Sequence, residues 1–172
     1  MNTLNRPAMN LFVILLLTLT TSAMVSPQES ATILAGAELS QVVPSGFYFQ
    51  EKSGGTQMRN AAAARFGSNR YVIAGLVDTS GYAADVREKY QGFLITDSPV
   101  RIGGFELPTG AYGFGFSNDG KFTILDVSGK EVFTQQAAQD KDLKRPRPLM
   151  MSKSGAGVRL YGGRSYVAIA AN

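Results

Sequence analysis

The 172-residue chain contains no histidine and no cysteine, and this limits the chemistry that it can perform. Histidine is the usual general base near neutral pH and a common metal ligand, while cysteine supplies nucleophilic thiolates, disulfides and thiolate metal sites. Catalytic triads, cysteine nucleophiles, disulfides and the usual zinc or copper sites are therefore excluded. Any catalysis would depend on aspartate, glutamate, lysine, arginine, tyrosine or serine.

The carboxylates do not form a recognisable catalytic pattern. A glycoside hydrolase needs two carboxyl groups at a defined separation, and no spacing in this sequence fixes such a pair. The acids of "DTSG" and "SNDG" lack the alternating pattern of a calcium loop and fit turns or helix caps instead. We therefore predict no catalytic residue, no metal site and no cofactor. A histidine-free hydrolase or lyase that uses carboxylates or tyrosine is the alternative hypothesis, and its candidate acids are Asp78, Asp85, Glu106 and Asp126.

Glycines and aromatic residues alternate in "GAYGFGF", residues 110–116, which could form a phosphate-binding loop or a strand. A phosphate loop lies between a strand and the N-terminus of a helix, and no helical pattern follows this stretch. In an extended strand, Tyr112, Phe114 and Phe116 share one face, and the positions between them, Gly113 and Gly115, leave the other face without side chains. The turn "SNDG" and another β-rich run follow, so the region predicts a strand within a β-meander.

Positive charge is concentrated between residues 141 and 153, at Lys141, Lys144, Arg145, Arg147 and Lys153. Such a run is most often a solvated loop, and Pro146 and Pro148 keep it out of a central strand. The other interpretation is docking on an anionic polymer or lipid, with binding that weakens as salt is added.

No nucleic-acid partner is predicted. The nearest approach to a basic, aromatic sheet face consists of Arg59, Arg65, Arg70 and Tyr71. No run of glycines, lysines and aromatic residues accompanies them, as it does in a typical RNA-binding sheet. The formal net charge of +4 is also modest for a nucleic-acid-binding protein.

The N-terminal segment is typical of an export signal. Arg6 precedes an apolar run over residues 11–17, and the small residues Thr21 and Ala23 fit a peptidase site after Ala23. We expect residues 1–23 to be a signal peptide and the mature protein to be periplasmic or extracellular, with no membrane span. A retained membrane anchor is the alternative, since residues 8–25 could be stretched towards a spanning length.

Residues 24–37 are expected to form a flexible leader, and residues 38–172 a single β-rich domain. The stretch "QVVPSGFYFQ" carries strand-forming residues on both sides of a turn. One short helix is expected at about 81–91, where Tyr82, Val86 and Tyr90 form an apolar stripe and Asp78 or Ser80 could cap the start.

Residues 56–66 are ambiguous between a helix and a strand. Four consecutive alanines favour a helix, whereas the turn chemistry of residues 67–69 and the clear strand after it favour a β-hairpin. We favour the hairpin, in which Met58 and Phe66 would lie on one face and Arg59 and Arg65 on the other.

Together these patterns predict a mainly β protein, a single antiparallel small barrel or sandwich built from meander hairpins and one short helix. The expected function is that of a non-enzymatic binding or structural module of the cell envelope or the extracellular space. Its expected partner is a small apolar ligand or an envelope component. If the sheet encloses a cavity, the candidate lining residues are Tyr48, Tyr71, Tyr112 and Phe114; in a filled interior the same side chains form the core.

Four segments carry a family resemblance: "RNAAAARF", "AGLVDTSGY", "EKYQGFLIT" and "LPTGAYGFGF". With them, the chain resembles uncharacterised exported bacterial proteins of acidobacterial type, in which an L-P-x-G-x-Y segment opens a β-hairpin. The resemblance covers most of the mature chain and implies an exported β-domain. It implies no catalytic residue, because its motif belongs to a turn and a strand.

Overall fold

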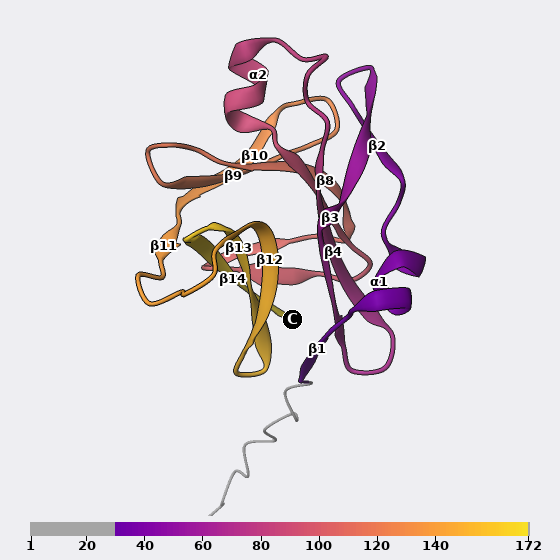
Figure 1. Cartoon of the computed structure of the whole chain (residues 1–172), viewed down its shortest axis with the longest axis vertical. Coiled ribbons are helices and arrows are strands. Elements are labelled where there is room, and N and C mark those ends of the chain that lie inside the picture. Colours follow the sequence, from indigo (N-terminus) through magenta and orange to yellow (C-terminus); the bar gives the residue numbers. More distant parts are fainter. Residues whose placement is uncertain (1–29, 172) are drawn as a thin grey trace, which may run out of the picture.

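The computed structural model describes residues 30–171, which form two antiparallel sheets and two short helices (Figure 1). The predicted signal peptide and residues 24–29 of the predicted leader lie outside this range. Within it, no helix is long and apolar enough to cross a membrane.

The large sheet has eight strands in the order β1-β3-β4-β5-β8-β9-β10, with β2 paired to β3 beside this path. All its pairings are antiparallel, and β8, β9 and β10 form the predicted meander. Its strands are β1 (Ala31–Ile33), β2 (Gly46–Phe49), β3 (Lys52–Phe66), β4 (Arg70–Val77), β5 (Gly92–Thr96), β8 (Gly110–Phe116), β9 (Lys121–Leu125) and β10 (Glu131–Gln136).

The small sheet has six strands in the order β12-β13-β14-β6-β7, and β11 pairs with β14 beside this path. Pro148 lies in the edge strand β12, in keeping with the rule that proline avoids central strands. The strands are β6 (Val100–Ile102), β7 (Phe105–Leu107), β11 (Ala138–Gln139), β12 (Arg147–Ser154), β13 (Gly157–Gly163) and β14 (Ser165–Ala171).

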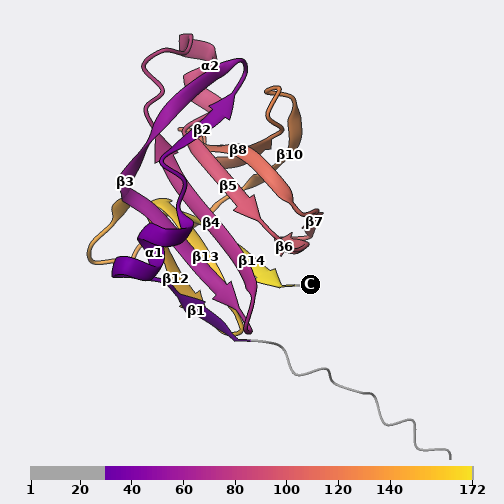
Figure 2. The ribbon, with the colours of Figure 1, turned by 90° about the vertical axis from the view of Figure 1, so that its right-hand side faces the viewer.

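The two sheets pack face to face, so the architecture corresponds to the sandwich rather than the closed barrel (Figure 2). The main core between them combines buried side chains from both, including Phe114 and Phe122 of the large sheet and Ile102 and Leu160 of the small one. The ring of Phe116 packs directly on Gly162, where a Cβ would lie only 2.4 Å from the ring. The sheets therefore approach each other closely at this end.

Strands β3 and β4 confirm the predicted hairpin, and Ala63 and Ala64 are completely buried. The alanine tract forms a strand because the small side chains of Ala62 and Ala64 pack in the core between the two sheets, so tertiary packing overrides helix propensity. The predicted alternation fails, however, because Thr56 pairs with Val77 and Ala61 with Gly75, which leaves four residues of β3 opposite one of β4. This bulge leaves Met58 exposed, whereas Phe66 is buried, so the two do not share a face.

The leader prediction is wrong for its described part. Ala31–Ile33 form β1, which pairs with residues 64–66 of β3, and Ala31 is buried. A second unpredicted element is the helix α1 (Gly36–Val42), which includes the residues that the sequence suggested as a strand before Pro44. These short segments are ordered by packing on β3 and have no strong local pattern of their own.

The predicted helix is present but shorter, as α2 (Ala84–Lys89). Asp78 does not cap it, because its carboxylate accepts the backbone N–H of Ser80 in a local turn and Ala83 occupies the cap position. Tyr82 and Tyr90 lie just outside the helix and are buried in a second core on the outer face of the large sheet, with Val86 packed beside them. The apolar stripe is therefore confirmed, although its tyrosines flank the helix.

Candidate functional site

The C-terminal end of α2 and the residue that follows it pack against the glycine face of β8. A Cβ on Gly113 would lie 2.7 Å from the ring of Phe49 and 3.1 Å from that of Tyr90. A Cβ on Gly115 would lie 2.4 Å from the backbone oxygen of Lys89. The bare face is thus covered by two aromatic rings and by backbone, which leave no room for a ligand on it.

Gln91 fixes this segment to the end of β8. Its side-chain amide donates to the backbone oxygen of Phe116 at 2.8 Å, and its amide oxygen accepts from the Phe116 N–H at 3.0 Å. The Gln91 backbone N–H donates to Phe114 at 2.8 Å. The Gln91 side chain therefore adds one more pair of hydrogen bonds at the end of the β5–β8 pairing. Gln91 also lines two depressions of the surface.

The main depression is a groove of about 870 Å³, called here the α2 groove. It lies between α2 and the β8–β10 part of the large sheet, which Figure 1 shows below the helix. Three basic and three acidic side chains line it, together with hydroxyl and amide groups. Its residues are Ala84, Arg87, Glu88, Lys89, Gln91, Phe116, Ser117, Asn118, Asp119, Lys121, Thr123, Glu131 and Thr134.

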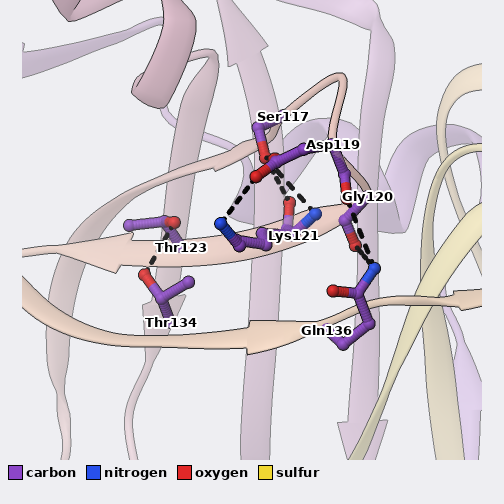
Figure 3. A network of polar contacts seen from close by, with 7 residues as sticks. All are labelled: Ser117, Asp119, Gly120, Lys121, Thr123, Thr134 and Gln136. Atoms are coloured by element: carbon purple, nitrogen blue, oxygen red, sulfur yellow. Dashed lines mark hydrogen bonds and ion pairs between the residues drawn. The ribbon is translucent and has the colours of Figure 1, made fainter.

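Two threonines form the floor of the α2 groove. Thr123 and Thr134 lie opposite each other on β9 and β10, and their hydroxyl groups are 2.8 Å apart (Figure 3). Thr123 is one of two buried polar residues in the described chain. A hydroxyl pair on a sheet face offers both donors and acceptors to a bound molecule.

A charged turn closes one end of the groove. Asp119 accepts a hydrogen bond from the Ser117 hydroxyl and pairs with the Lys121 ammonium at 2.6 Å (Figure 3). The Lys121 and Ser117 side chains together lower the pKa of Asp119 to about 2. Lys121 is also close enough to Glu131 for this acid to help raise the pKa of the lysine. The groove thus has fixed charges of both signs that balance each other.

A second depression of about 400 Å³ opens between the two sheets, next to the Gln91–Phe116 junction. Gln57 of the β3 bulge lies at its edge and donates to the Val77 backbone oxygen at 3.1 Å. Bulges are common beside binding sites because they redirect side chains. The lining residues are Gln57, Leu76, Val77, Thr79, Gln91, Phe116, Pro148 and Gly162.

The four predicted apolar-ligand residues do not converge. Tyr112 and Phe114 lie on the inner face of β8, where Phe114 is fully buried and the Tyr112 hydroxyl donates to the Pro108 backbone oxygen. Tyr71 precedes Val72, an inner-face core residue of β4, so it lies on the opposite face of the large sheet. Tyr48 is 57% exposed on β2, beside a shallow hollow with Val127. Tyr112 and Phe114 therefore contribute to the core, whereas Tyr48 and Tyr71 lie away from them, and the four side chains line no common cavity.

The five predicted basic residues are all exposed, but they do not form one group. Lys141, Lys144 and Arg145 lie in the β11–β12 connection, and Arg147 begins β12. Lys153 lies six residues further along this strand, a separation of roughly 20 Å. The sequence also missed two arginines that join the first four, Arg159 and Arg164.

The arrangement that a carboxylate-dependent hydrolase would need does not assemble in residues 30–171. No aspartate or glutamate in this range is buried, and no three potential metal-ligating side chains gather there. Asp119 has a lowered pKa, whereas a general acid needs a raised one. The buried Tyr90 hydroxyl lines neither depression described above.

The sequence interpretation missed the α2 groove because its residues come from three separate segments, 84–91, 116–123 and 131–134. The one available signal was the pair of threonines at mid-strand positions of β9 and β10, which are suited to face each other in a meander. No protein-family model, curated protein or solved structure matches this chain.

Proposed function

We propose that this protein is an exported binding module of the cell envelope or the extracellular space, and that it holds a neutral oligosaccharide in the α2 groove. The observation that carries the proposal is the lining of the groove, in which only Ala84 and Phe116 lack a polar side chain. Such a surface suits a ligand with many hydroxyl groups, since amides, carboxylates and guanidinium groups can each exchange hydrogen bonds with them.

The balance of charge favours an uncharged ligand over an ionic one. Three basic and three acidic side chains line the groove, and Lys121 interacts with both Asp119 and Glu131. A strongly anionic or cationic ligand would meet as many repulsive as attractive groups. Export is supported by the signal-like N-terminal segment.

The test is isothermal titration calorimetry with a panel of neutral hexose oligosaccharides of about four to six units, a length chosen to fill a ligand site of several hundred Å³. We expect one or more members to bind, and Glu88→Ala and Glu131→Ala to weaken that binding about tenfold or more. Glu106→Ala is the matched control, since Glu106 is an exposed acid on β7 outside the groove. No binding by the folded wild-type protein, or equal effects of all three variants, would reject the proposal.

A further inference from the structure

The charge of the described domain is unevenly distributed. Residues 30–171 contain 16 of the 17 basic residues and 12 of the 13 acidic ones, since only Arg6 and Glu29 fall outside. Six of these basic residues gather at one end of the small sheet, accompanied by Asp140 and Asp142. The other ten basic and ten acidic residues cancel, so this basic end carries the whole net charge of +4. Its basic residues are Lys141, Lys144, Arg145, Arg147, Arg159 and Arg164.

Hydrogen bonds hold the basic end together. The Arg164 guanidinium donates to the backbone oxygens of Asp140 and Lys141 at 3.3 and 3.0 Å, and the Asp140 N–H donates back to Arg164 at 2.9 Å. Arg147 pairs with Gly163, the neighbour of Arg164, in the β12–β13 ladder. The loop after β11, which projects at the side of the small sheet in Figure 1, is thereby fixed against the β13–β14 turn.

The acids of the basic end leave most of its positive charge uncompensated. The Asp140 carboxylate accepts from the Tyr161 hydroxyl at 3.0 Å and lies 3.9 Å from the Arg159 guanidinium. It therefore interacts with side chains of β13 and not with the lysines of the loop. Lys141, Lys144, Arg145 and Arg147 are exposed and form no ion pair with an acid of residues 30–171. Four cations within seven residues of chain, with Asp142 as the one acid among them, carry an excess of positive charge that attracts an extended anion.

We propose that the basic end binds an acidic polysaccharide. Arginine guanidinium groups bind carboxylate and sulfate groups through paired hydrogen bonds, and four of the six basic residues are arginines. A bilayer fits less well, because membrane docking uses apolar side chains, and the large exposed apolar residues of the described chain lie elsewhere, at Tyr48, Met58, Val127 and Val132.

A single-stranded nucleic acid also fits less well, because such polymers stack their bases on open aromatic rings. The two aromatic residues beside the basic end are closed to stacking. Tyr161 is buried, and the Arg159 guanidinium covers the ring of Tyr166 at 4.5 Å from its centroid. A hydrated polymer with regularly spaced anionic groups needs only the exposed cations.

The test uses the purified chain and three probes: immobilised polygalacturonate, immobilised heparin, and vesicles with about a third anionic lipid, a fraction high enough to attract polybasic surfaces. We expect polysaccharide binding that weakens about tenfold between about 50 and 300 mM NaCl as the charges are screened. The triple variant Lys144→Gln/Arg145→Gln/Arg147→Gln should bind at least about tenfold more weakly. The control Arg59→Gln/Lys130→Gln/Lys153→Gln removes the same charge from exposed sites elsewhere and should bind as the wild type does.

Equal weakening by both triple variants, salt-independent binding, stronger binding to the vesicles, or no binding to either polysaccharide would overturn the proposal. The groove variant Glu131→Ala should bind polygalacturonate and heparin normally, since it lies outside the basic end. This result separates the inference from the proposed groove function, so that either can fail while the other holds.

Discussion

The ring of Phe49 stacks on the ring of Tyr90, with centroids 3.8 Å apart and 12° between the planes, and both rings lie against Gly113. Phe49 ends β2 and Tyr90 follows α2, so the stack joins two segments that are distant in the sequence. Tyr82 strengthens the junction by donating its hydroxyl hydrogen to the Phe49 backbone oxygen at 2.9 Å. The stack therefore positions α2, which forms one wall of the α2 groove.

Adding a methyl group to the glycine face should destabilise the fold. In Gly113→Ala the new Cβ would press on the rings of Phe49 and Tyr90, and we expect a loss of about 1–3 kcal/mol in the free energy of unfolding. Gly115→Ala should cost more, because its Cβ would meet the rigid backbone oxygen of Lys89. Denaturant unfolding measures both, with Gly55→Ala as the control, since a Cβ added there would point into open space. A Gly113→Ala protein as stable as the control would show that the stack does not rest on β8.

The two tyrosines of this cluster should respond differently to loss of their hydroxyl groups. Tyr82→Phe should lower stability by about 1 kcal/mol or more, because two backbone oxygens, those of Phe49 and Lys52, lose their donor. Tyr90→Phe should leave stability unchanged or raise it, because the buried Tyr90 hydroxyl has no hydrogen-bond partner among residues 30–171. Thermal unfolding of both variants at neutral pH checks the contrast, and an equal loss in the two would contradict it.

The same pair predicts sensitivity to alkaline pH. Burial raises the pKa of Tyr90, and to a lesser extent that of Tyr82, above the ordinary tyrosine value of 10.0. The folded protein then holds these protons more tightly than the unfolded chain, so stability is lost as pH rises above that value. Tyr90→Phe should unfold at a higher pH than the wild type when the strand content is followed by far-ultraviolet circular dichroism as the pH is raised. An unchanged midpoint would mean that Tyr90 ionises without unfolding.

Asp119 should titrate at unusually low pH. Its pairing with Lys121 and Ser117 lowers its pKa from 3.8 to about 2, so its stabilising effect is present above the ordinary value and disappears as pH falls through about 2. Carboxyl-carbon NMR should give a midpoint near 2 for Asp119 and a higher midpoint in the Lys121→Gln variant. Because both side chains of the pair are exposed to solvent, added salt should move the wild-type midpoint upward. A wild-type midpoint at or above 3.8 would contradict the ion pair.

The β2–β3 turn should gain stability from a glycine. Gln50 and Glu51 both have positive φ, 44° and 64°, a conformation that costs about 1–2 kcal/mol for residues with a side chain. The Gln50 side chain contacts Gly129 and its backbone N–H donates to Val127, so this residue has a structural role. Glu51 is exposed, and Glu51→Gly should raise the free energy of unfolding by about 1 kcal/mol. Gly55→Ala serves again as the neutral reference in denaturant unfolding, and a destabilised Glu51→Gly would show that Glu51 makes a stabilising contact.

Local patterns were sufficient for the elements whose residues alternate or repeat regularly. The alternation in "GAYGFGF" predicted β8 with an aromatic and a bare face, and the tyrosine stripe predicted α2. The meander β8–β9–β10 followed from its turn residues. Such predictions succeed because side-chain periodicity reflects which face of an element is buried.

Elements ordered by distant partners could not be predicted in the same way. β1 forms because Ala31–Ile33 pair with the last residues of β3. The bulge in β3 arises from its pairing with β4, and no local sequence pattern encodes that register. The α2 groove likewise depends on Phe49, Tyr90 and Gln91 fixing α2 on the far side of β8.

The sequence by itself determined a histidine-free and cysteine-free chemistry, a mainly β fold, and a strand with one face of glycine. Only the tertiary structure decided what that face meets, which strands form each sheet, and which charges gather at the basic end. The physical reason is that composition and periodicity are properties of neighbouring residues, whereas grooves and charged surfaces arise where segments far apart in the chain pack together.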